Sequence, residues 1–260
     1  MEPTEIAVAV SAYLGLKDLV PRILGPTTDY LGGELRSYTE KGASNLRRIF
    51  KNAGDKLGDR LNEPGQVSPK VLKNVLEEGY FSEDELAAEY FGGVLASSRT
   101  SNSRDDRGAT FIKLVSRLSV YQLRMHHVFY ATVRKRHSGT PANIFQQSER
   151  KSALKTFVSF GAFVRGLDLQ EGEEVATLLP HILNGLIREG LIEDDFAGGD
   201  VAHIKKSKGL DVPEDGMVMS PSALGLELFL WAYGKGNLSL SAMFDPSVEM
   251  KALPGILYPA

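Results

Sequence analysis

Charged side chains that could hold an anion gather in the stretch EYFGGVLASSRTSNSRDDRG, from Glu89 to Gly108. Its basic members are Arg99, Arg104 and Arg107. Guanidinium groups near one turn can hold a carboxylate or a phosphate through forked hydrogen bonds. The alternative is a structural loop, in which the arginines pair with Asp105, Asp106 or Glu89. We keep both interpretations open and take the three arginines as candidate anion-binding or partner-binding residues.

The two aspartates of this stretch have a simpler explanation. A hydrolytic pair would need a metal or a further carboxylate placed by the fold, and neighbours in sequence seldom converge on one substrate. At a helix start, Asp105 can instead cap free amides, and Asp106 complements the positive end of the helix dipole. We therefore expect the two aspartates to begin a helix.

Signatures of catalysis are missing from the sequence. No Gly-rich loop ends in Gly-Lys-Ser/Thr, so a P-loop nucleotide site is not supported. Ser159 lacks the glycine two positions earlier that a nucleophile elbow needs, and the chain has no cysteine. Adjacent His126 and His127 would point about 100° apart on a helix, which does not suit a shared metal. We expect no catalytic residue, no metal site and no cofactor, and a binding protein rather than an enzyme.

Composition places the chain among globular proteins of one large or two modest domains. Its 260 residues include 30 basic and 33 acidic side chains, so no global field steers it to nucleic acid or to membranes. The absence of cysteine rules out disulfides and suits a reducing compartment. We expect a cytoplasmic protein. Peripheral membrane association is an alternative through the amphipathic run at 6–16, which is too short to span a bilayer.

Helical patterns fill residues 1–103, which we expect to form an all-helical region. Pro21, Gly25 and Pro26 are expected to end the first helix. Most of Thr28–Leu61 reads as a second helix, because its apolar residues recur at three- and four-residue steps. Later helix starts are marked by serine caps with a proline, glutamate or glutamine partner. These pairs are Ser68 with Pro69, Ser82 with Glu85, and Ser119 with Gln122.

Residues 104–236 are expected to form a winged-helix-like domain, followed by a C-terminal tail at 237–260. After two helices, residues 138–150 read as a loose polar segment, and 153–164 are ambiguous between buried helix and strand. A further helix, two short extended pieces around a basic loop, and a closing helix from Ser220 complete the pattern. The expected fold class is mainly α, with an N-terminal helical region and a small two- or three-stranded wing.

The basic loop of this wing holds a second group of candidate residues. Lys205, Lys206 and Lys208 could contact the phosphates of a nucleic acid. The helix that would enter a DNA groove opens with carboxylates, which repel DNA. These are Glu171, Glu173 and Glu174. We therefore favour protein contacts over nucleic-acid binding and keep both hypotheses.

Local charge is uneven along the second half of the chain. Residues 104–155 hold eleven basic and three acidic side chains, whereas residues 165–200 hold two basic and nine acidic ones. Opposite charges of this size in one domain can neutralise each other across the fold.

The order of LGPTTDYLG, GQVSPKVL and EYFGGVLASSR with RDDRG resembles the abortive infection alpha family of bacterial proteins, over residues 24–235. The resemblance implies defence against bacteriophage, in which an infected cell stops growing or dies before the phage completes its cycle. It brings no catalytic residues. The expected function is a non-enzymatic binding or effector module that acts on a host or phage protein. The alternatives are a winged-helix nucleic-acid-binding regulator and a membrane-associated effector that uses the N-terminal helix.

Overall fold

The computed structural model describes residues 15–16, 19–24, 40–102, 104–140 and 143–253. Contacts divide the chain into two compact units. The first comprises Met1–Arg117 with Trp231–Asn237, and the second comprises Leu118–Leu230 with Leu238–Ala260. This division differs from the expected boundary at 103, because the helix that follows the arginine loop packs on helices of the first unit.

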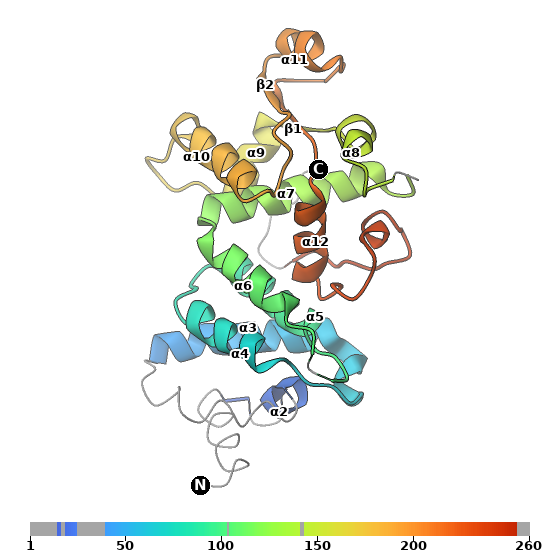
Figure 1. The fold of residues 1–260 in the computed structure, drawn as a ribbon. Coiled ribbons are helices and arrows are strands. Elements are labelled where there is room, and N and C mark those ends of the chain that lie inside the picture. The colour runs from blue at the N-terminus through green and yellow to red at the C-terminus, as the bar shows by residue number, and fades with distance from the viewer. Residues whose placement is uncertain (1–14, 17–18, 25–39, 103, 141–142, 254–260) are drawn as a thin grey trace. The chain divides into compact units, whose positions relative to one another are not determined.

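The first unit is built from helices (Figure 1, blue to green). They are α2 (Leu19–Leu24), α3 (Glu40–Leu57), the 3-10 helix η3 (Gly58–Asn62), α4 (Pro69–Gly79), α5 (Glu85–Ser97) and α6 (Arg107–Arg117). α3 packs along α5, and α6 packs on both α4 and α5. The apolar stripe expected in the second helix faces the core, where Leu46, Phe50 and Ala53 are fully buried. Among the described residues of this unit the regular elements are helices, joined by one isolated antiparallel bridge between Gln66 and Thr100.

Two helix starts in the first unit differ from the expected caps. Ser68 precedes α4 as expected, but its side chain makes no capping hydrogen bond. The cap of α5 is Asp84, whose carboxylate accepts a hydrogen bond from the Ala87 amide, so the predicted Ser82 cap is wrong. Pro21 lies within the first turn of α2, where an amide needs no intrahelical partner, and α2 ends at Leu24, directly before Gly25 and Pro26 in the sequence.

The second unit joins helices to a small antiparallel sheet. Its helices are α7 (Val120–His137), α8 (Gln147–Ala153), α9 (Phe160–Leu167), α10 (Val175–Arg188), α11 (Val201–Lys208), the 3-10 helix η4 (Leu240–Met243) and most of α12 (Ala223–Ala232). The strands are β1 (Thr156–Ser159), β2 (Ala197–Gly199) and β3 (Gly216–Met219), in the order β1-β3-β2. The mainly helical class with a three-stranded sheet is confirmed.

Helix α7 forms the centre of the second unit. It begins with the predicted capping box, in which Ser119 and Gln122 each bond the other's backbone amide. Many of its side chains are buried, including His126 and Tyr130, which are fully enclosed. The Tyr130 hydroxyl donates to the Leu191 carbonyl and accepts from the Ser222 amide, so α7 fixes the segments before β2 and α12.

Several segments of the second unit differ from the sequence-based expectation. The region 138–150, expected to be loose, contains the first turn of α8, and the ambiguous region 153–164 is strand β1 followed by helix α9. The expected basic loop is helix α11, because the Asp200 side chain caps the His203 amide and Gly209 ends the helix at a φ of 67°. The part of the tail that the structure describes packs onto α7, since Arg134 donates to four carbonyls between residues 242 and 248.

Candidate functional site

The structure gives the three candidate arginines of the 89–108 stretch separate environments. Arg99 is almost completely buried, with 9% of its surface exposed. Its guanidinium donates to the carbonyls of Arg22, Arg60 and Glu63 at 3.1, 2.9 and 2.5 Å. Burial lowers the pKa of this guanidinium, and a methyl group at Gly65 would collide with it. Arg99 therefore links the η3 region to the end of α5. Its guanidinium donors are directed at backbone carbonyls and not at an external anion.

Arg107 and Arg104 lie on the surface of the first unit. Arg107 forms a double hydrogen bond with Asp105, which lowers the pKa of that carboxyl, and its guanidinium carbon lies 5.2 Å from the Trp231 ring centre. The Asp105 carboxylate also accepts from the Arg107 amide, consistent with the expected role of this aspartate at a helix start. Arg104 is exposed, and no ion pair to it occurs within the described part of the chain.

The remaining acidic residues of the stretch also have partners. Asp106 pairs with Lys70 of α4 at 2.8 Å, and Glu89 pairs with Lys56 of α3. Arg107 pairs with Asp105, as the structural alternative predicted, whereas Asp106 and Glu89 pair with lysines and Arg99 bonds only backbone carbonyls among the described contacts. Of the three candidate arginines, Arg104 alone is exposed without a carboxylate partner among the described residues.

The lysines expected in the wing lie on α11, and two of the three are paired. Lys205 contacts Asp211 at 2.7 Å, and Lys208 contacts Asp195. Hydrogen bonding to Asp211 raises the pKa of Lys205. Lys206 is exposed and forms no ion pair among the described residues. The positive charge available to a phosphate is therefore smaller than the three lysines suggest.

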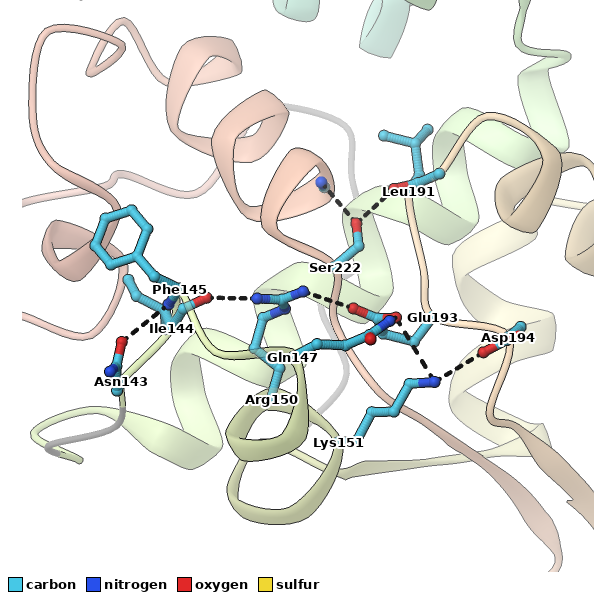
Figure 2. A network of polar contacts seen from close by, with 12 residues as sticks. Asn143, Ile144, Phe145, Gln147, Arg150, Lys151, Leu191, Glu193, Asp194 and Ser222 are labelled. Carbon is cyan, nitrogen blue, oxygen red and sulfur yellow. Dashed lines mark hydrogen bonds and ion pairs between the residues drawn. The ribbon is translucent and has the colours of Figure 1, made fainter.

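A buried ion pair that the sequence did not single out holds the segment that leads into strand β2. Arg150 and Glu193, both less than a tenth exposed, contact at 2.8 Å between Nη2 and Oε1. The other Arg150 Nη donates to the Ile144 carbonyl at 2.7 Å, and Gln147 donates to the second Glu193 oxygen (Figure 2). Lys151 completes the cluster with a 2.8 Å contact to Asp194. Side chains from one turn of α8 thus hold residues 193–194, which precede strand β2.

This cluster joins the two stretches of opposite charge. Arg150 and Lys151 belong to the basic stretch, whereas Glu193 and Asp194 belong to the acidic one. Arg124 also contacts Asp168, at 3.4 Å, across the same two stretches. The uneven charge in the sequence was the signal for these contacts, although it could not name the pairs.

Helix α10 occupies the position of the helix expected to face a partner. Its exposed face carries Thr177, Pro180, His181 and Asn184, and ends at Arg188. Of the carboxylates before it, Glu173 accepts a hydrogen bond from Tyr121, which lowers the pKa of Glu173, while Glu171 and Glu174 are exposed. The surface is therefore acidic at the helix start and uncharged along most of its length.

Two buried histidines contact polar groups of the second unit. His126 faces the Gly225 carbonyl through Nε2 at 3.2 Å, and His137 contacts the Thr156 hydroxyl at 3.0 Å. Burial lowers the pKa of both imidazoles, that of His126 to about 3. No group of three potential metal ligands occurs in the described part of the chain.

Comparison with known proteins leaves the site to be interpreted from its own geometry. No family model, curated protein or solved structure matches the chain. Among the helices that the structure describes, none is both long enough and apolar enough to cross a membrane. The N-terminal helix considered for membrane association falls mostly outside the described residues.

Proposed function

We propose that the chain is an antiphage defence protein of the abortive infection type, which acts as a non-enzymatic module by binding another protein. The resemblance of LGPTTDYLG, GQVSPKVL and EYFGGVLASSR to the abortive infection alpha family supports the defence role. The geometry of the second unit supports the binding mode, and the surface of α10 is the observation on which this choice depends.

The order of elements in the second unit supports a winged-helix-like binding module. Helices α9 and α10 form a consecutive pair, and the strands β2 and β3 that follow them make an antiparallel hairpin. Strand β1, which precedes the pair, hydrogen-bonds to the other edge of β3 and closes the sheet. This is the arrangement in which the second helix of a pair faces a partner and the hairpin flanks it.

The charge on α10 favours a protein partner over DNA. A helix that enters a DNA groove needs hydrogen-bond donors toward the bases and positive charge toward the phosphate backbone. The exposed face of α10 offers Arg188 as its one cation, and the exposed carboxylates of Glu171 and Glu174 precede it. An uncharged helix face with a proline and a histidine suits a protein surface, whose contact core is depleted in charge.

Phage plating on cells that express the chain tests the proposal. A matched pair of variants separates the α10 face from a general effect of added charge: Asn184→Arg on α10, and Thr110→Arg on the exposed side of α6. We expect plating to fall for the wild type and for Thr110→Arg, and to recover for Asn184→Arg. If the wild type leaves plating unchanged across a broad panel of phages, the proposed function is wrong.

One observation keeps nucleic-acid binding as the second candidate. Lys206 is exposed on α11 without an ion pair in the described residues, next to the two paired lysines. A regulator that uses this helix would bind duplex DNA with an affinity that falls steeply as salt rises. Binding that vanishes in Lys206→Ala would favour this function over the first, and absent or salt-insensitive binding would remove it.

A further inference from the structure

The first unit contains a segment that comes late in the chain. Residues Trp231–Asn237, called here the return segment, join this unit after the chain has passed through the second unit. Helix α12 is continuous from Ala223 to Ala232, so the boundary between Leu230 and Trp231 falls inside one helix. The return segment therefore begins as the end of a helix whose residues 223–230 belong to the second unit.

Helix α5 holds the backbone of the return segment. The Ser97 hydroxyl donates to the Trp231 carbonyl at 3.2 Å and accepts from the Gly236 amide at 3.0 Å. Gly93 lies one turn earlier on the same face of α5. A Cβ at this position would lie 1.8 Å from the Ala232 carbonyl oxygen, so the glycine allows the close approach of the two backbones.

Helix α6 contacts the indole of Trp231. This side chain is fully buried, and its ring centre lies 4.8 Å from that of Phe111. The Arg107 guanidinium carbon lies 5.2 Å from the same ring. The residues that receive the return segment, called here the acceptor site, are Gly93, Ser97, Arg107 and Phe111. All but Phe111 belong to the stretch 89–108, which therefore binds a segment of its own chain.

The first part of α12 is packed in the core of the second unit. His126 Nε2 lies 3.2 Å from the Gly225 carbonyl oxygen. The His127 ring centre lies 5.6 Å from that of Phe229, which is almost completely buried. One helix thus places side chains in the cores of both units, Phe229 in the second and Trp231 in the first.

The end of α12 depends on helical residues of the second unit. In an α-helix each amide donates to the carbonyl four residues earlier, so the amides of Trp231 and Ala232 rely on residues 227 and 228. A helix of 10 residues has little stability without tertiary packing. Unfolding of the second unit would therefore unwind α12 and withdraw the Trp231 side chain, a large apolar contact, from the acceptor site.

We propose that α12 and the return segment couple the two units, so that a change that loosens one unit also loosens the other. Such coupling is a free energy and acts equally in both directions. A partner bound to the second unit can thereby alter the first unit without touching it. The coupling does not depend on the defence role and holds for any partner of the second unit.

Tryptophan fluorescence tests the coupling from the second unit to the first. Trp231 is the only tryptophan of the chain and reports on the acceptor site. Leu167→Ala removes a buried side chain from α9 in the second unit, and Leu72→Ala removes one from α4 in the first. We expect both variants to lower the urea midpoint of the Trp231 signal by about 1 M. A midpoint that moves in Leu72→Ala alone would overturn the proposal.

Hydrogen exchange followed by mass spectrometry supplies an independent readout of the second unit. Amides of α7 should exchange faster in Leu167→Ala, which shows that the second unit has been loosened. If Leu167→Ala does not fold, Val158→Ala in β1 takes its place, because it removes less volume from the core.

Gly93→Ala tests the opposite direction, because its methyl group collides with the Ala232 carbonyl and displaces the return segment. Gly161→Ala adds the same methyl group at an exposed position of α9 and serves as the control. We expect Gly93→Ala to speed amide exchange about tenfold in α7 as well as in α5, and Gly161→Ala to change neither. Ser97→Ala, which removes two hydrogen bonds to the return segment, is the milder variant. Faster exchange confined to the helices of the first unit would overturn the proposal.

Discussion

Arg99 directs its hydrogen bonds to the backbone of its own unit. It donates to the carbonyls of residues 22, 60 and 63, so one side chain links segments that are far apart in the sequence. A planar guanidinium can reach three acceptors in fixed directions, whereas an ammonium group presents a compact point charge. The residue therefore stabilises the first unit.

We expect Arg99→Lys to lower the free energy of unfolding by about 2 to 3 kcal/mol, because buried carbonyls lose charge-assisted hydrogen bonds. Arg104→Lys is the matched control, since Arg104 is exposed, and its effect should stay within about 0.5 kcal/mol. Urea unfolding of both variants measures the difference. Equal stability of the two would contradict the structural role of Arg99.

His126 makes the stability of the second unit depend on pH. Burial holds the pKa of this imidazole at about 3, below its ordinary value, so the folded chain keeps it neutral. The unfolded chain protonates it below about pH 6.5, and the stability is therefore present above that pH and lost as pH falls toward 3. Burial shifts the pKa of His137 in the same direction.

Between about pH 6 and pH 4.5, we expect His126 to contribute a loss of about 1 kcal/mol or more per pH unit. Unfolding titrations of the wild type and of His126→Gln measure this slope, and the variant should be flatter. His181→Gln changes an exposed histidine and serves as the control. A slope that is unchanged in His126→Gln would show that the buried imidazole does not govern the acid response.

Two residues before helix α5, Ser82 and Asp84, could cap its N-terminus, and the structure uses Asp84. Ser82 and Asp84 both precede the helix, and the carboxylate of Asp84 reaches the Ala87 amide. We expect Asp84→Ala to cost about 1 kcal/mol of stability and Ser82→Ala to cost almost nothing. Thermal or urea unfolding distinguishes them, and the reverse order would support the capping box that the sequence suggested.

Helix α8 holds the segment before strand β2 through the buried ion pair between Arg150 and Glu193. Removing one partner of a buried ion pair leaves the other uncompensated, so Arg150→Ala should cost about 3 to 5 kcal/mol. Lys151→Ala breaks the more exposed contact to Asp194 and should cost less than about 1 kcal/mol. Calorimetric unfolding compares the two. A small loss in Arg150→Ala would contradict the anchoring role of the pair.

Local signals predicted most helices but not the contacts between them. The Ser119–Gln122 box and the apolar stripe of α3 were readable because each depends on residues within one or two turns. Helix α11 was missed because its glycine and lysines resemble a loop, while its cap and ion pairs act at its two ends. The pair Arg150–Glu193 joins positions 43 residues apart, and no local pattern specifies such a partner.

At the scale of the whole molecule, the near-neutral net charge conceals two oppositely charged stretches of sequence, and part of the basic stretch pairs with the acidic stretch inside the second unit. Arg124, Arg150 and Lys151, three of the eleven basic residues of that stretch, form ion pairs with the acidic stretch. Of the three arginines proposed to bind an anion, Arg99 and Arg107 likewise use their guanidinium groups for contacts within the first unit. Both sets of contacts leave less positive charge for a phosphate than the sequence alone suggested.

The most direct test of the defence role is a liquid-culture infection of cells that express the wild-type chain, at low and at high multiplicity of phage. Abortive defence predicts that the culture survives at low multiplicity and collapses at high multiplicity, with few phage released per infected cell. Cells with an empty vector should collapse at both. Survival at high multiplicity, or collapse at low multiplicity with a normal phage yield, would contradict the account.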